Sequence, residues 1–257
     1  MSKFKLTFRQ SLEKIVDDLK IDLTSEAKYT TKLQPLKIRK KKIQAVTKEF
    51  SNEELKYWKQ FGITRKTLDL FNVKSAKYIY IDKKLAMRAT TLNPIFVYYF
   101  PDTQNFKVYR PLTKDKDKWL SNTTGNDVYG ANTLPFTGDR LFITSSLKDV
   151  MCLYEMGYTA IAPQSETTKL TVPYVDSLKQ TFKEVLVFFD TDGEFNPPKS
   201  RPGKGKEAAN NASKRYGVDM VFTNDDKCKD ISDYYQKYGK AKAKKLMDKL
   251  EAMKYQD

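Results

Sequence analysis

Histidine is absent from this 257-residue chain, and cysteine occurs only twice. Without histidine, the chain lacks the side chain that most often acts as a general base or binds a metal at neutral pH. Cys152 and Cys228 are too few for a disulfide framework or for a cysteine-rich zinc site. Catalysis by this chain would therefore have to depend on carboxylates, Lys, Tyr or a bound metal ion.

Long apolar stretches and a signal peptide are also absent. No run approaches the ~20 apolar residues that a membrane-spanning helix needs, and the opening Met-Ser-Lys-Phe-Lys does not have the pattern of a secretory signal. We therefore expect a cytoplasmic protein that has no membrane partner. With 40% apolar and 13% aromatic residues, the chain can instead bury a substantial core.

Positive charge exceeds negative charge, and the excess lies in the first half of the chain. The formal net charge is +15, and residues 1–135 hold 27 Lys and Arg against 14 Asp and Glu, whereas residues 136–257 hold 20 against 18. The basic first half can attract a polyanion such as a nucleic acid, and acids clustered in the second half can hold a cation. A Lys-rich surface that serves solubility would explain the total charge but not its uneven distribution.

The order of predicted elements divides the chain into four parts. They are an N-terminal helix with a basic linker (residues 1–49), a smaller basic α+β subdomain (50–136), an α/β domain (137–238) and a C-terminal helix (239–257). The helix of the first part is expected over residues 4–23, and the polar, basic residues 24–47 are expected to form the linker.

In the second part, Ser51 and Thr64 are predicted to cap two short helices. Antiparallel strands are expected at residues 78–81, 95–100 and 106–110. Basic and aromatic side chains alternate here and just beyond, which is typical of proteins that bind single-stranded nucleic acid. The candidates for such contacts are Arg110, Lys118 and Trp119. Each aromatic residue could instead belong to the core, as we predict for Trp58.

The third part alternates strands and helices. Strands are predicted at residues 141–144, 160–162, 185–189 and 219–222, and helices at 147–156, 172–182 and 206–216. Strands that are separated by helices of about ten residues predict a parallel sheet flanked by helices. Two further helices are expected after Asp230 and after Gly239.

The apolar run at residues 185–189 leads directly into Asp190-Thr191-Asp192-Gly193. Such a run is typical of a strand that is buried on both faces, and its carboxyl end is where open α/β sheets bind ligands. Asp190 and Asp192 would repel each other there, and Mg²⁺ or Mn²⁺ would relieve the repulsion. An alternative is an ordinary turn with solvated carboxylates.

Polar residues follow the other predicted strands of this part as well: Ser145 to Asp149, then Gln164-Ser165-Glu166, and later Asp225, Asp226 and Asp230. Acids that converge on one edge of a sheet would destabilise the fold without a partner. The pattern therefore favours a metal site over solvated turns.

These motifs resemble the Toprim fold of DnaG-type primases, topoisomerases and some nucleases. Residues 145–149 (Ser-Ser-Leu-Lys-Asp) align with the family's Glu-Gly-x-x-Asp, residues 190–193 match its Asp-x-Asp-Gly, and residues 229–233 (Lys-Asp-Ile-Ser-Asp) resemble its Lys-Asp-Pro-type element. The first half resembles the basic part of phage-type primase cores at residues 57–64, 109–111 and 118–122. The likeness extends over residues 50–240.

Two departures from the family pattern stand out. Ser145 replaces the family glutamate, and Glu166, at the end of the next predicted strand, is the nearest acid that could take over its role. Alternatively, Glu166 begins the following helix, where an acid is favoured by the helix dipole. The sequence also contains neither a Cys/His zinc module nor a Walker motif. We therefore expect either that the chain is a fragment of a longer protein or that a zinc-binding module and a helicase lie on other chains.

The resemblance implies a primase that makes RNA primers on single-stranded DNA from ribonucleoside triphosphates, in a bacterial or phage-infected cell. It implies Mg²⁺ or Mn²⁺ ions held by Asp190, Asp192, Asp230 and Glu166. The implied catalytic residues are Asp190, Asp192, Glu166 and Asp149. The implied nucleic-acid or nucleotide contacts are Arg110, Lys118, Trp119, Lys148 and Lys229. A Toprim nuclease and a catalytically silent nucleic-acid-binding subunit remain alternatives.

Overall fold

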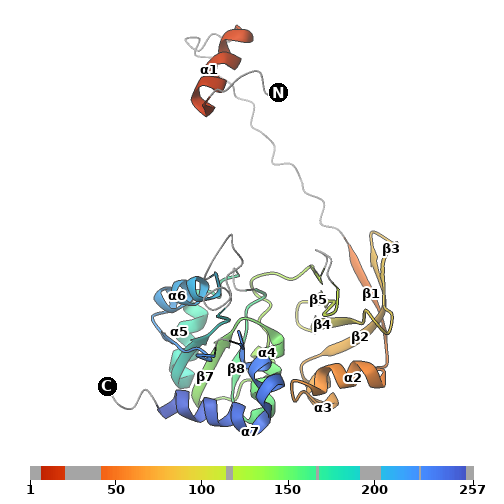
Figure 1. Ribbon diagram of the computed structural model, residues 1–257, viewed down its shortest axis with the longest axis vertical. Helices are drawn as coiled ribbons and strands as arrows, with labels where there is room; N and C mark the ends of the chain where they lie inside the picture. The colour runs from red at the N-terminus through yellow and green to blue at the C-terminus, as the bar shows by residue number, and fades with distance from the viewer. Residues whose placement is uncertain are drawn as a thin grey trace. The chain divides into compact units, whose positions relative to one another are not determined.

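The computed structural model describes residues 7–20, 42–113, 118–165, 168–191, 204–225 and 227–252. The chain forms two units, residues 1–40 and residues 41–257. In the first unit, α1 (Phe8–Asp18) confirms the predicted N-terminal helix, and Thr7 and Gln10 form its capping box (Figure 1). Residues 24–41 of the predicted linker lie outside the described residues.

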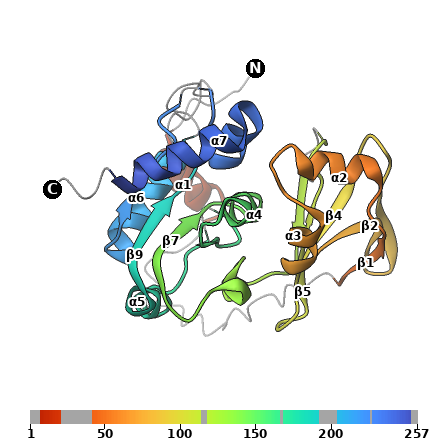
Figure 2. The same ribbon diagram turned by 90° about the horizontal axis from the view of Figure 1, so that it is seen from below.

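The second unit begins with an antiparallel sheet (Figure 2). Its strands are β1 (Ile43–Lys48), β2 (Val73–Ile81), β3 (Lys84–Arg88), β4 (Ile95–Phe100), β5 (Asn105–Tyr109) and β6 (Trp119–Ser121). The order is β1-β2-β4-β5-β6, and β3 also pairs with β2. The predicted strands are confirmed as β2, β4 and β5. The linker prediction was wrong for residues 43–47, which form β1 and pair with β2.

The helices α2 (Asn52–Lys59) and α3 (Arg65–Leu70) cover one face of this sheet (Figure 2). Ser51 and Thr64 cap them as predicted, because their hydroxyls accept hydrogen bonds from backbone N–H groups in the first turns. Trp58 of α2 is completely buried, and its ring centroid lies 4.9 Å from that of Phe96 on β4. Trp58 is therefore a core residue, as the sequence predicted.

Glu54 joins α2 to the sheet through a buried carboxylate. It accepts hydrogen bonds from the Ser51 N–H (2.8 Å) and the Ser75 hydroxyl (2.9 Å), and it forms an ion pair with Lys48 Nζ at 2.7 Å. These three partners come from the helix cap, β2 and β1. The carboxylate therefore fixes the helix relative to two strands.

We expect Glu54→Ala to lower the free energy of unfolding by about 2–3 kcal/mol, because the substitution leaves the buried Ser75 hydroxyl and the Lys48 ammonium without their partner. Equilibrium unfolding in urea measures this loss. Glu53→Ala is the matched control, since Glu53 is exposed on the same helical turn and should change stability little. Equal losses in the two variants would contradict the role given to Glu54.

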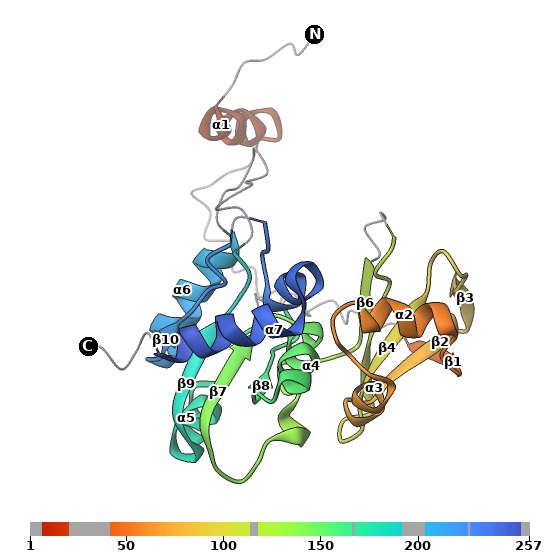
Figure 3. The same ribbon diagram turned by 60° about the horizontal axis from the view of Figure 1, so that its bottom comes forward.

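A parallel four-stranded sheet forms the second half of this unit (Figure 3). Its strands are β7 (Gly138–Thr144), β8 (Ala160–Ile161), β9 (Phe182–Phe188) and β10 (Asp219–Met220), in the order β10-β9-β7-β8. The helices are α4 (Leu147–Met156), α5 (Val172–Thr181), α6 (Lys204–Tyr216) and α7 (Ile231–Ala252). The predicted alternation of strands and helices is confirmed. Gly239 breaks the helical path within α7 with φ 80°, which agrees with the two helices expected there.

Both faces of the parallel sheet are covered, as the apolar run at residues 185–189 predicted. Leu186 and Phe188 of β9 pack in one cluster with residues of α4 and α7. Val185 and Val187 point to the opposite face and pack with residues of α5 and α6. The two helix pairs lie on either side of the strands in Figure 3. Because successive side chains alternate between the faces, an apolar residue is needed at each position from Val185 to Phe188.

The two sheets share a hydrophobic core. Trp58, Phe96 and Tyr98 of the antiparallel part belong to the same buried cluster as Leu147 and Met151 of α4. A hydrogen bond from the Thr64 N–H to Glu155 Oε1 (2.9 Å) also joins the two parts. Among the described helices, none has the length and apolar character that crossing a membrane requires. The domain boundaries predicted near residues 136 and 238 stay predictions.

Candidate active site

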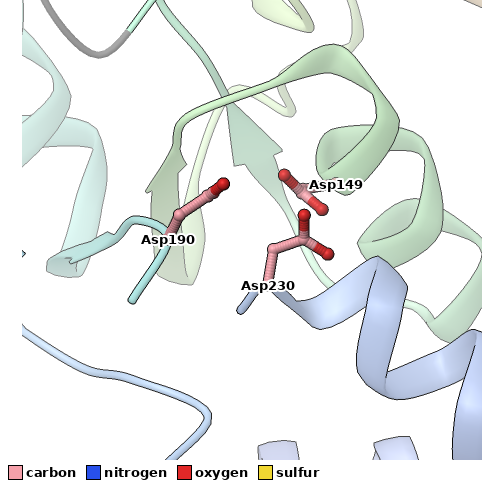
Figure 4. A group of neighbouring side chains, drawn as sticks. All are labelled: Asp149, Asp190 and Asp230. Carbon is pink, nitrogen blue, oxygen red and sulfur yellow. The ribbon is translucent and has the colours of Figure 1, made fainter. Parts of the chain in front are cut away.

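Three buried carboxylates meet at the carboxyl end of the parallel sheet (Figure 4). Asp149 lies in the first turn of α4, Asp190 follows β9, and Asp230 immediately precedes α7. They are 2%, 6% and 6% exposed, and one oxygen from each lies within 4.8 Å of the others. Residues that are far apart in the sequence thus form one compact group of acidic oxygens.

The positions of these carboxylates follow from the local structure. β7 and β9 are hydrogen-bonded neighbours, so the loops that follow them open at the same edge of the sheet. Ser146 caps α4 by accepting a hydrogen bond from the Asp149 N–H, which fixes Asp149 in the first turn. Asp230 Oδ1 accepts a hydrogen bond from the Asp233 N–H at 2.7 Å and so stands at the start of α7.

Serine hydroxyls orient the three carboxylates. The Ser146 hydroxyl donates to Asp149 Oδ2 at 2.6 Å, and the Ser232 hydroxyl lies 2.5 Å from Asp149 Oδ1 and 2.8 Å from Asp230 Oδ1. The Ser145 hydroxyl donates to Asp190 Oδ1. Ser145, which the motif resemblance aligns with a glutamate, is therefore in direct contact with the acidic group.

Two lysines balance part of the negative charge. Lys148 Nζ lies 3.7 Å from Asp230 Oδ2 and 3.3 Å from Asp233 Oδ1. Lys229 Nζ lies 3.3 Å from Asp190 Oδ2 and 3.8 Å from Asp230 Oδ2. Both ammonium groups therefore lie beside the carboxylates, where they can contact an anionic ligand.

The crowding of the acids shifts their pKa values in different directions. Burial and then the neighbouring Asp230 raise the pKa of Asp149 to about 6, and the same two causes raise the pKa of Asp190 well above its usual value. Burial also acts to raise the pKa of Asp230, but Lys148 and Lys229 outweigh it and hold that pKa below its usual value. Two of the three groups therefore resist ionisation unless further positive charge arrives.

This arrangement fits a divalent cation. Three carboxylates supply hard oxygen donors from separate elements at short mutual distances, as a Mg²⁺ or Mn²⁺ site requires. After burial, repulsion from Asp230 contributes most to the raised pKa values of Asp149 and Asp190. A bound cation would remove this repulsion. The group is thus consistent with a metal site.

A cleft of about 680 Å³ opens above the acids and reaches the antiparallel sheet. Asp190, Asp230, Lys148 and Lys229 line one side. The other side is formed by basic and aromatic residues of β5 and β6, namely Lys107, Tyr109, Lys118 and Trp119. The cleft therefore combines an acidic floor with a basic and aromatic wall.

The aromatic wall is built by Trp119 and Tyr109. Their rings stack with centroids 4.3 Å apart and an interplanar angle of 13°, and Trp119 remains 42% exposed. Lys107 Nζ lies 4.2 Å from the centre of the Trp119 ring and donates a hydrogen bond to the Gln164 carbonyl oxygen. Burial lowers the pKa of Lys107 to about 8. An exposed ring beside a lysine can stack on a base and contact a phosphate.

The structure brings most of the predicted site residues together. Asp190, Asp230, Lys148 and Lys229 line the acidic end of the cleft, Asp149 lies beside Asp190 and Asp230, and Lys118 and Trp119 line the opposite wall. Arg110 is not among the residues that line the cleft in the described part of the chain; its N–H donates to the Lys118 carbonyl oxygen at 3.0 Å. Asp192 and Glu166 lie outside the described residues. The roles assigned to all of these residues stay predictions.

Lys107 belongs to the basic and aromatic pattern that the sequence indicated for the antiparallel part, and it lines the wall of the cleft. Two further residues at the site were not selected from the sequence. Ser146 and Ser232 contact Asp149. Their spacing gave no such signal, because a serine before a helix or in its first turn is common in any protein.

Comparisons with known proteins point to one fold. No protein-family model and no curated protein matches this sequence. The zinc-binding and RNA polymerase domains of Aquifex aeolicus primase match with a TM-score of 0.53 and 15% identity, over 77% of this chain and 56% of that chain. A DnaG primase catalytic domain bound to single-stranded DNA matches with a TM-score of 0.52 and 16% identity, over 77% of this chain and 74% of that one.

The primase fragment of the bacteriophage T7 primase-helicase is a third similar structure. Its TM-score is 0.51 at 17% identity, over 73% of this chain and 71% of the fragment. The fold of this chain is therefore that of DnaG-type primase catalytic cores, which confirms the resemblance predicted from the motifs. The chain spans little more than half the length of the Aquifex protein.

Proposed function

We propose that this chain is the catalytic core of a DNA primase, which joins ribonucleotides on a single-stranded DNA template. The observation that carries the proposal is the position of the acidic group. Asp149, Asp190 and Asp230 meet at the strand ends of a primase-core fold, directly beneath a basic and aromatic cleft. The assignment of the parallel sheet to the Toprim type belongs to the same proposal.

Asp190, Asp230 and Asp149 would hold Mg²⁺ or Mn²⁺, and Asp192 and Glu166 are proposed as further ligands. When bound, the divalent ions would neutralise triphosphate charge, activate a primer 3′-hydroxyl for attack on the α-phosphate and stabilise the pyrophosphate that leaves. The chain's own contribution is orientation. Serine hydroxyls fix the carboxylates of Asp149, Asp190 and Asp230 before any ligand arrives.

Lys148 and Lys229 are proposed to bind the triphosphate. Their ammonium groups lie within 4 Å of oxygens of Asp230 and Asp190, so the phosphates of a metal-bound triphosphate would come close to both positive charges. On the opposite wall, Trp119 would stack on a base and Lys118 would contact a phosphate of the template. Arg110 is proposed to contact nucleic acid from the end of β5, beyond the cleft.

Partners follow from the proteins that share the fold. The Aquifex structure joins the polymerase domain to a zinc-binding domain, and the phage fragment comes from a primase-helicase. We propose that template recognition and strand separation are supplied to this chain by a zinc-binding module and a helicase on other chains.

A catalytically silent nucleic-acid-binding subunit is the second candidate. The contact between Ser145 and Asp190 favours it, because a serine stands where the family has a carboxylate. The silent subunit would bind single-stranded DNA without a metal and would not turn over.

The deciding experiment combines single-stranded DNA, labelled ribonucleotides and Mg²⁺ or Mn²⁺, and follows both extension and cleavage. A primase makes short RNA products and leaves the DNA intact. Cleaved DNA would support a Toprim nuclease, and binding without either product would support the silent subunit. Omission of the metal is the control, and it should remove extension without removing DNA binding.

Binding of single-stranded DNA should weaken steeply with salt, because each neutralised phosphate releases counterions. We expect Lys118→Gln to lower the log–log slope of affinity against salt by about one unit if Lys118 makes one phosphate contact. Fluorescence anisotropy over a salt series measures this slope. Lys244→Gln on the exposed side of α7 is the matched control and should leave it unchanged. An unchanged slope for Lys118→Gln would remove this residue from the template path.

A further inference from the structure

The β2–β3 hairpin carries a concentration of positive charge outside the cleft. Residues 77–88 hold four basic side chains and one acid. Lys77, Lys83, Lys84 and Arg88 are all exposed, and none of them forms an ion pair within the part of the chain that the structure describes. Like charges on neighbouring strands repel one another, so an anionic ligand would stabilise this surface.

The turn of the hairpin keeps a lysine where glycine is favoured. Ile81 pairs with Lys84, so Asp82 and Lys83 form a two-residue turn. Their φ angles are 49° and 67°, and both residues therefore lie in the left-handed region. Two-residue turns of this kind prefer Asn or Asp first and Gly second, because Gly has no Cβ to clash there. Asp82 follows this preference, whereas Lys83 is kept at a cost in stability.

Hydrogen bonds hold this turn against the start of the neighbouring strand. The Asp82 N–H donates to the Lys42 carbonyl oxygen at 2.9 Å, and Asp82 Oδ1 accepts a hydrogen bond from the Lys42 N–H at 3.0 Å. The backbone that carries Lys83 and Lys84 is therefore already ordered, which lowers the cost of binding a ligand there. A lysine that served only solubility could occupy any exposed position, so a strained and anchored one indicates a ligand.

The hairpin lies farther along the sheet that forms one wall of the cleft. β6 belongs to that wall, and β5 and β4 separate it from β2. Figure 3 shows β3 at the outer end of the antiparallel sheet, on the side away from the parallel sheet. Three strand spacings correspond to about 14 Å, and a stacked strand that rises about 3.4 Å per nucleotide covers this distance with about four nucleotides. A single strand that leaves the cleft can therefore reach the hairpin.

We propose that the tip of the β2–β3 hairpin binds phosphates of the single-stranded template outside the cleft, chiefly through Lys83 and Lys84. The inference rests on the proposed function, because that function supplies a single strand beside this sheet. An ammonium group is a point charge that suits phosphate oxygens, and contacts to phosphates carry no information about the bases. The hairpin would thus extend the template site without selecting a sequence.

Binding of oligothymidylates of two lengths to the full chain, measured by fluorescence anisotropy, tests the hairpin. Strands of about 5 and about 16 nucleotides lie within the range of single-strand sites, and only the longer one extends from the cleft to the tip. The double variant Lys83→Gly/Lys84→Gln should bind the longer strand about 25-fold more weakly at about 0.1 M salt, because a slope of about 0.7 per phosphate corresponds to about 5-fold per contact. Affinity for the shorter strand should stay within about 2-fold. An unchanged affinity for the longer strand, or equal losses for both, would overturn the proposal.

Two further variants separate a local contact from an effect of net charge. Lys83→Arg keeps the charge at the tip and should keep the affinity for the longer strand. Lys66→Gln removes one charge from an exposed position on α3 and should leave that affinity unchanged. If Lys66→Gln weakened binding as much as Lys83→Gly alone, the effect would be one of total charge and the hairpin site would be refuted.

Thermal unfolding supplies a measurement that does not depend on DNA. Lys83→Gly should leave Tm unchanged or raise it by up to about 4 °C, because glycine relieves the left-handed backbone. Weaker binding by a variant of equal or greater stability cannot result from a damaged fold. A fall in Tm would show that Lys83 serves the turn itself and would overturn the proposal. The two proposals fail separately: a length-dependent loss of binding without primer extension contradicts the primase, whereas extension with unchanged affinities in the hairpin variants contradicts the hairpin site.

Discussion

Asp190→Asn is expected to reduce primer extension at least about 1000-fold while the affinity for single-stranded DNA stays within a factor of about three. The substitution keeps the shape of the side chain and removes one of the three charges that would hold the metal. The proposed phosphate contact of the template comes from Lys118 on the other wall, so the substitution should leave it unaffected. The same result is expected for Asp192→Asn.

Two assays separate the effects in Asp190→Asn. Extension of labelled primers measures turnover, and fluorescence anisotropy measures DNA binding. Asp176→Asn is the control, because Asp176 is an exposed acid on α5 and should retain full activity. Circular dichroism should show that each variant is folded. Full activity of Asp190→Asn would refute the metal assignment, and loss of DNA binding would place Asp190 in the binding surface instead.

Glu166→Gln is expected to lower extension by about 100-fold or more, which is the usual contribution of a general acid or base. The motif resemblance aligns Ser145 with a glutamate, so the expected carboxylate is missing at this position. The Ser145 hydroxyl contacts Asp190 instead. Ser145→Glu in the Glu166→Gln background should restore part of the activity, since the new carboxylate would enter the acidic group. The measurement is again primer extension at saturating metal.

The competing explanation placed Glu166 at the start of the following helix. α5 begins at Val172 and is capped by Thr171, five residues beyond Glu166, so its first turn does not include this acid. Glu207→Gln is the matched control, because Glu207 does lie in the first turn of α6. It should melt slightly lower and keep full activity. A fully active Glu166→Gln variant would contradict the relocated carboxylate.

Secondary structure was predictable wherever a local pattern decided it. The apolar run of residues 185–189 indicated a strand buried on both faces, and β9 is such a strand. The serine and threonine caps at Ser51 and Thr64 were equally clear, because capping depends on residues within one helical turn. β1 was missed, since a short strand that follows four basic residues and carries polar side chains on one face reads as a linker.

The sequence by itself determined which residues could form the candidate site. Its motifs indicated Asp149, Asp190 and Asp230 because each lies at the end of a predicted strand or at the start of a predicted helix, and parallel strands bring such positions to one edge. The lack of histidine also restricted the chemistry to carboxylates, lysines, tyrosines and a bound metal ion. These conclusions needed only local order and the rules of α/β connection.

Only the tertiary structure decided how the two halves of the chain meet. Lys107 lies 57 residues before Gln164, yet its ammonium group donates to the Gln164 carbonyl and joins the aromatic wall to the parallel sheet. The Ser232 hydroxyl likewise contacts Asp149, which lies 83 residues earlier in the chain, and it also contacts Asp230. No sequence pattern encodes such contacts, because they depend on how one sheet packs against another, and packing reflects the shapes of many side chains at once.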